Sequence, residues 1–92
     1  MGSKEFLNAA FGAILTYVND NLDKSDGMKL DANDIYVVWM CKTLQNCKGL
    51  FSTKLPDGMY YEVTYNGDAE EMYLDAYKKW ENVVVVKATS EN

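Results

Sequence analysis

The chain has 92 residues, which is enough for one small domain and too few for two. It contains 9 Lys and 14 acidic residues, a net charge of -5, and neither Arg nor His. Without imidazole it lacks the usual proton shuttle at neutral pH and the commonest metal ligand. Without guanidinium, and with a negative charge, it suits nucleic-acid phosphates poorly. Composition therefore argues against an enzyme, against a metal or cofactor site, and against direct nucleic-acid binding.

The sequence also carries no membrane or export signal. No apolar run reaches the roughly 18–20 residues that a membrane helix needs. The first residues lack the basic region and apolar core of a secretory signal. We therefore expect one soluble domain over residues 1–92, in the cytoplasm and without membrane contact.

Residues 4–22 are predicted to form an amphipathic helix. Apolar side chains recur there at steps of three and four residues, the periodicity of one helical face; they are Leu7, Ala10, Phe11, Ile14, Tyr17, Val18 and Leu22. The next segment, 23–34, is polar and acidic without periodicity, and is predicted to be a loop.

Three segments then have the pattern of β-strands, at residues 35–44, 48–55 and 59–65. Turn signals separate them at Gln45-Asn46 and at Pro56-Asp57-Gly58, and Asn66-Gly67 predicts a further hairpin. Within the first strand, simple alternation puts two sets of side chains on opposite faces: Ile35, Val37, Trp39 and Cys41 on one, and Tyr36, Val38, Met40 and Lys42 on the other.

The C-terminal third is ambiguous. Residues 71–80 fit a strand or a helix, and the Asn66-Gly67 hairpin favours the strand because it needs a partner. The four valines within 83–87 have β propensity. They either continue the fourth strand, form a fifth, or pair in place of 71–80 if that segment is a helix. The predicted fold is α+β, with the N-terminal helix packed on an antiparallel meander of four or five strands.

Candidate reactive groups are sparse. Cys41 and Cys47 are too few for a metal site without His. If the first hairpin turns near Gln45-Asn46, Cys47 faces Leu44, which does not allow a disulfide with Cys41. The best candidates for a basic patch are Lys42, Lys48 and Lys54.

The acidic segment from Asp20 to Asp34 suggests a cation site but fits one badly. If Gly27 took the sixth place of an EF-hand loop, Leu22 and Lys24 would fall on ligand positions. A solvated acidic loop is the simpler interpretation. A weak cation-binding module or small enzyme built on this segment is an alternative.

The remaining positive feature is a set of aromatic side chains. If the helix covers one sheet face, the other is expected to present an interaction surface of six residues: Tyr36, Met40, Phe51, Tyr60, Tyr73 and Tyr77. Tyr and Met are enriched at protein interfaces, and an open apolar face on a small domain indicates a partner protein or a second copy, as in a homodimer. In the alternative interpretation, segment 23–34 or the C-terminal segment covers this face.

Several stretches resemble a small family of uncharacterised phage and prophage proteins of Gram-positive bacteria. They are residues 22–26, 37–46, 52–68 and 73–82, and the specific part is the middle block, residues 52–68, which contains Leu55-Pro56-Asp57-Gly58-Met59-Tyr60-Tyr61. The resemblance covers most of residues 4–82, while the four valines and the tail after Lys87 depart from it. It implies the cytoplasm of a bacterial host. The family has no established activity, cofactor or catalytic residue, so it contributes no site residue.

Together, composition and resemblance predict a non-catalytic phage or prophage accessory protein that acts as a protein-interaction module. An alternative is an acidic inhibitor that imitates nucleic acid and occupies a host nucleic-acid-binding factor.

Overall fold

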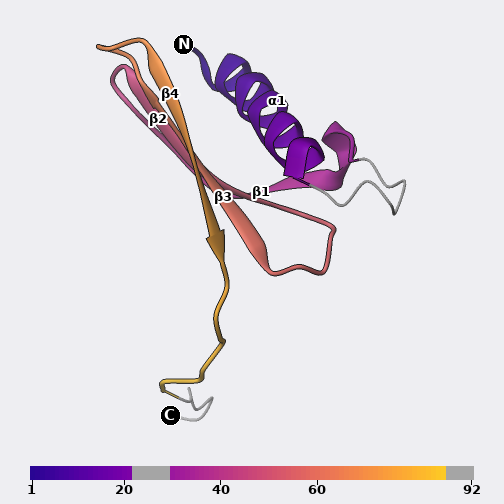
Figure 1. Ribbon diagram of the computed structural model, residues 1–92. Coiled ribbons are helices and arrows are strands. Elements are labelled where there is room, and N and C mark those ends of the chain that lie inside the picture. Colours follow the sequence, from indigo (N-terminus) through magenta and orange to yellow (C-terminus); the bar gives the residue numbers. More distant parts are fainter. Residues whose placement is uncertain (22–29, 87–92) are drawn as a thin grey trace.

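The computed structural model describes residues 1–21 and 30–86. Helix α1 (Ser3–Asn21) is followed by a short 3-10 helix, η2 (Ala32–Asp34), and four strands. These are β1 (Ile35–Thr43), β2 (Asn46–Thr53), β3 (Met59–Asn66) and β4 (Glu71–Lys78). The strands form one antiparallel sheet in the order β1-β2-β3-β4, and α1 lies on one face of it (Figure 1). The predicted α+β meander is confirmed, and segment 71–80 is a strand up to Lys78.

Helix α1 buries one stripe of apolar side chains against the sheet. Phe6, Ala10, Ile14 and Val18 are the buried residues of the helix, each four positions after the last, so they line one side of it. The predicted start of the helix is confirmed to within one residue. Its predicted last residue, Leu22, lies outside the part of the chain that the structure describes.

The core lies between this stripe and the inner face of the sheet, which we define as the face toward α1. The ring of Phe51 is fully buried there, with its centroid 5.8 Å from that of Phe11 and 6.4 Å from that of Phe6. Gly49, two residues earlier on the same face, leaves room for this ring, because an added Cβ would lie 2.9 Å from it. Ile35, Cys47, Tyr61 and Val63 complete the strand contribution to the core.

The two hairpin turns at one end of the sheet contact each other. Gly67 lies so close to the carbonyl oxygen of Gln45 that any Cβ would collide with it, and its N–H donates to Asn46 Oδ1 over 3.0 Å. The Asn66-Gly67 signal therefore marks a real hairpin. However, its loop spans four residues and the left-handed residue is Glu70, so Gly67 is required by this close approach.

The expected strand at 83–87 is not formed over its described residues, 83–86. The cause is the register of the sheet. Met59, the first residue of β3, pairs with Lys78, so the chain beyond Lys78 has no strand beside it with which to pair. The four valines are 60–88% exposed and run away from the sheet (Figure 1).

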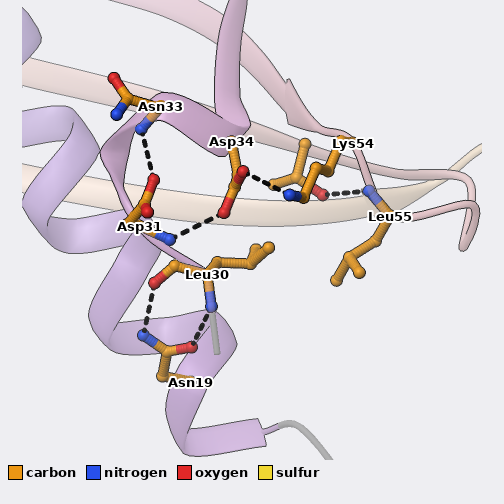
Figure 2. A network of polar contacts seen from close by, with 8 residues as sticks. Asn19, Leu30, Asp31, Asn33, Asp34, Lys54 and Leu55 are labelled. Carbon is orange, nitrogen blue, oxygen red and sulfur yellow. Dashed lines mark hydrogen bonds and ion pairs between the residues drawn. The ribbon is translucent and has the colours of Figure 1, made fainter. Parts of the chain in front are cut away.

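A network of polar contacts ties the end of α1 to the start of the sheet (Figure 2). The amide of Asn19 exchanges hydrogen bonds with the main chain of Leu30, at 3.2 and 3.4 Å. Asp31 and Asp34 form a capping box around η2, in which each carboxylate accepts from a backbone N–H over 2.9 Å. Lys54, just after β2, places its Nζ 2.7 Å from Asp34 Oδ1.

The Asp34–Lys54 pair should make stability depend on pH. The hydrogen bond from Lys54, with a second from the Asp31 backbone, lowers the pKa of Asp34 below its usual 3.8. A carboxyl group whose pKa is lower in the folded protein than in the unfolded chain stabilises the fold at pH values above its ordinary pKa. This contribution is lost as the pH falls through the lowered pKa. The same pair raises the pKa of Lys54 above 10.5, so its contribution persists until pH rises beyond that value.

We therefore expect Asp34→Asn to lower the denaturant midpoint at pH 7 and to change it progressively less as pH falls below 4. Urea unfolding of wild type and variant at a series of pH values measures this. Asp68→Asn, in the exposed loop between β3 and β4, is the control. The difference between its denaturant midpoint and that of wild type should be the same at every pH in the series. An Asp34→Asn effect of equal size at both ends of the series would contradict the role of the ion pair.

Candidate functional site

The face of the sheet away from α1, which we call the outer face, carries a row of tyrosines. The register aligns one residue from each strand directly across it: Tyr36, Ser52, Tyr60 and Tyr77. Tyr36 and Tyr77 are about half exposed. Ser52 is only 6% exposed because it is the small member of the row between Tyr36 and Tyr60, and its hydroxyl donates to the Met59 carbonyl over 2.8 Å.

A bulge in β1 brings Trp39 to the same face. The register shifts between Val37 and Trp39, so one extra residue, Val38, opposes β2. Trp39 then pairs with Leu50, in the row next to the tyrosines, and its side chain is 43% exposed. Simple alternation predicts Trp39 on the face with Ile35, and this prediction is wrong. Every residue from Ile35 to Cys41 is apolar or aromatic, so no local signal marks the bulge.

The predicted interaction surface is therefore corrected at two positions. Met40, which lies beyond the bulge, falls on the inner face and packs against the core. Phe51 is fully buried in the core, because the register pairs Ser52, and not Phe51, with Tyr60. The other four predicted residues do share the outer face. With Trp39 they form what we call the tyrosine face: Tyr36, Trp39, Tyr60, Tyr73 and Tyr77.

Charged groups lie among these aromatic rings. Glu62 and Asp75 are direct cross-strand neighbours, and Lys48 Nζ lies 3.6 Å from Glu62 Oε2. Tyr77 donates its hydroxyl to Glu62 Oε1 over 3.3 Å, and Tyr73 donates to Glu71 Oε2 over 2.6 Å.

These contacts keep the two tyrosines as hydrogen-bond donors. The negative charge of Glu62 is the main cause that raises the pKa of Tyr77, and the hydrogen bond to Glu71 raises the pKa of Tyr73. Both phenols are therefore protonated at neutral pH, and each presents a ring edge whose hydroxyl is already oriented.

Two shallow hollows lie on this side of the sheet. One, of about 320 Å³, is lined by Leu50, Tyr60, Tyr77, Lys78 and Lys79. The other, of about 480 Å³, is lined mainly by outer-face residues near the hairpin turns, among them Trp39, Cys41, Lys48 and Thr64. Both are open depressions between protruding side chains, of a size that accepts single side chains of a partner.

The two cysteines lie on opposite faces. Cys41 pairs with Lys48 and is exposed on the outer face, whereas Cys47 is buried on the inner face. Both thiols are free. Cys47 was expected opposite Leu44, but the turn begins one residue earlier than predicted and Cys47 pairs with Lys42.

The basic patch suggested by Lys42, Lys48 and Lys54 does not form one surface. Lys42 lies on the inner face and Lys48 on the outer face. Lys48 and Lys54 are each in an ion pair, with Glu62 and Asp34.

Of the acidic segment proposed as a cation site, Asp23 and Asp26 lie outside the described residues. Asp31 and Asp34 are engaged in the capping box. Within residues 1–21 and 30–86, no group of three or more His, Cys, Asp or Glu is placed to hold a metal ion. In the same residues, no helix is long and apolar enough to cross a membrane.

Comparison with known proteins relates this chain to one family. No curated protein and no solved structure matched it. A family model described as a family of unknown function, DUF6275, matches residues 7–87, which include α1, the whole sheet and the four valines. The chain therefore belongs to the DUF6275 family.

Proposed function

We propose that this protein is a non-catalytic interaction module that binds a partner protein through its tyrosine face. The observation that carries the proposal is the row formed by Tyr36, Tyr60 and Tyr77 across the sheet, with Trp39 beside it. No other described element covers this face (Figure 1). Tyr and Trp give large contact areas at a low cost in conformational entropy, and their polar atoms are easily satisfied at an interface.

The charges on the face indicate the kind of partner. Glu62, Glu71 and Asp75 lie on this face with Lys48, which is paired with Glu62, and Lys78 and Lys79 line the hollow beside Tyr60 and Tyr77. The net charge of the chain is -5. A complementary partner presents apolar or aromatic side chains to the row and Lys or Arg to Glu71 and Asp75, but no cation to the hollow lined by Lys78 and Lys79, because like charges brought together at an interface are unfavourable.

The cellular setting belongs to the same proposal. We propose an accessory protein of a phage or prophage that acts in the cytoplasm of its bacterial host. The resemblance of residues 37–46, 52–68 and 73–82 to phage and prophage proteins supports this setting.

Removing tyrosines from the face tests the proposal. The variant Tyr73→Ala with Tyr77→Ala should keep the fold, because both side chains are exposed, and should weaken binding of the partner. Interface hot spots cost at least about 2 kcal/mol each when truncated, so we expect a loss of about 30-fold or more. The measurement is capture from infected-host lysate, followed by titration of the purified captured protein.

The matched control places alanine on the solvent side of α1, at Lys4, Asn8 and Thr16, which are all exposed. This variant should bind like wild type. Equal binding by the tyrosine variant and wild type would refute the assigned surface.

A further inference from the structure

The chain has two unpartnered features that complement each other: an exposed apolar segment after β4 and an open apolar edge at β1. We propose that residues 83–86 of one copy add as a strand to the edge of β1 in a second copy, and that the exchange is reciprocal. The product is a closed dimer whose interface is distinct from the tyrosines of β3 and β4.

The first feature is the run Val83-Val84-Val85-Val86. These residues are 60–88% exposed, and the structure places no described strand or helix against them. Four consecutive exposed β-branched residues are costly to leave in water and favour an extended backbone. The family match extends to residue 87 and so includes this run.

The second feature is the edge of the sheet at β1. The strand order leaves β1 and β4 as the two edges. An edge strand presents unpaired N–H and C=O groups, and charged side chains are the usual protection against added strands. β4 has such charges in Glu71, Asp75 and Lys78, whereas the only charged residue of β1 is Lys42, next to its last residue.

The exposed apolar side chains of β1 also favour association with the valine segment of a second copy. Tyr36, Val37, Val38 and Trp39 are 40–51% exposed. After the bulge, the regular stretch from Trp39 to Thr43 offers an unbroken ladder of five residues, long enough to pair with the four valines.

The segment cannot reach the same edge of its own sheet. A strand added outside β1 lies four interstrand spacings from β4, about 19 Å. The five residue steps from Lys78 to Val83 span at most about 17–18 Å when fully extended. The chain after β4 also runs away from the sheet (Figure 1). The occupant of the edge is therefore the segment of a second copy.

The exchange covers exposed apolar side chains in both copies. The four valines are 60–88% exposed and Trp39, at the start of the regular stretch of β1, is 43% exposed. Removing such side chains from water favours association. Each copy supplies one segment and one edge, so a reciprocal dimer leaves no segment and no β1 edge unpaired.

Sedimentation velocity over a dilution series from millimolar to micromolar tests the proposal with the full chain. Wild type should pass from dimer to monomer. Val85→Pro removes a ladder N–H and should weaken the dimer about tenfold or more, with an unchanged monomer melting curve. Val85→Ile, which keeps the strand preference, should associate like wild type. A monomer throughout the wild-type series, growth beyond two copies, or an unchanged Val85→Pro dimer would each overturn the proposal.

Cys41 provides an internal reporter of the contact, because it is exposed on β1 while Cys47 is buried. When each of Val83, Val84, Val85 and Val86 is replaced in turn with cysteine, at least one variant whose new side chain lies on the outer face should form a disulfide with Cys41 of another copy under mild oxidation. Cys41→Ser should abolish this disulfide. Asn8→Cys, on the exposed side of α1, should form no such link. Peptide mass spectrometry identifies the bond. A link formed only within one chain, or no link at any of the four positions, counts against the exchange.

This inference and the proposed function fail separately. The Tyr73→Ala, Tyr77→Ala variant should dimerise normally, and Val85→Pro should still capture the partner protein.

Discussion

Replacing Phe51 with alanine is expected to lower the free energy of unfolding by about 3–5 kcal/mol. The ring is fully buried at the centre of the sheet and contacts Phe6 and Phe11 of α1. Gly49 beneath it supplies no side chain to fill the space, so the cavity would persist. Because domains of this size are stable by about 5–15 kcal/mol, the variant should lose a large part of its stability. Urea unfolding followed by circular dichroism measures the change.

The control for Phe51→Ala is Tyr36→Ala, which removes an aromatic ring of similar size from the exposed outer face. Tyr36→Ala should lower the free energy of unfolding much less than Phe51→Ala does. Phe51→Leu keeps most of the side-chain volume, so its stability can be measured even if Phe51→Ala does not fold. We expect Phe51→Leu to lower the free energy of unfolding less than Phe51→Ala does. Equal losses at positions 51 and 36 would mean that the inner face is not the core.

Replacing Ile14 with alanine is expected to cost about 2–5 kcal/mol, the second largest effect among single substitutions considered. Ile14 is fully buried in the middle of the α1 stripe, between Ala10 and Val18. Alanine favours the helix itself, so any loss reports contact between α1 and the sheet and not helix propensity. Urea denaturation gives the size of the loss.

Thr16→Ala, on the exposed side of the same helix, is the matched control and should change stability little. Ile14→Val should lie between the two, at about 0.5–1.5 kcal/mol. A near-neutral Ile14→Ala would show that the sheet is stable without the docked helix.

The tyrosine face shows how far alternation alone can predict a surface. Alternation predicts that Tyr73 and Tyr77 share one face of β4, because it depends only on neighbouring residues. That Tyr36 and Tyr60 lie on the same face as these two depends on the register between strands, and the structure confirms it. Phe51 was assigned wrongly because its face relative to Tyr60 depends on the register between two strands. Met40 and Trp39 exchanged faces because a single extra residue, Val38, reverses the alternation after it.

The C-terminal valines illustrate a different limit. Their β propensity is a local preference, and a strand forms only where a neighbouring strand offers main-chain partners. The partner of β4 begins at Met59, opposite Lys78, so the single chain has no place for the valines in its sheet. Whether they pair at all then depends on a second copy, as proposed above.

The amino-acid sequence by itself determined the kind and order of the elements: the α1 stripe at helical spacing, the turns, and the strands that follow. These depend on interactions between residues close in the chain. Only the tertiary structure decided which face α1 covers, the pairing register of the strands, the bulge at Val38 and the close approach of Gly67 to Gln45. Both faces of the sheet are rich in apolar side chains, so the choice between them is made by packing between distant segments, which no local pattern encodes.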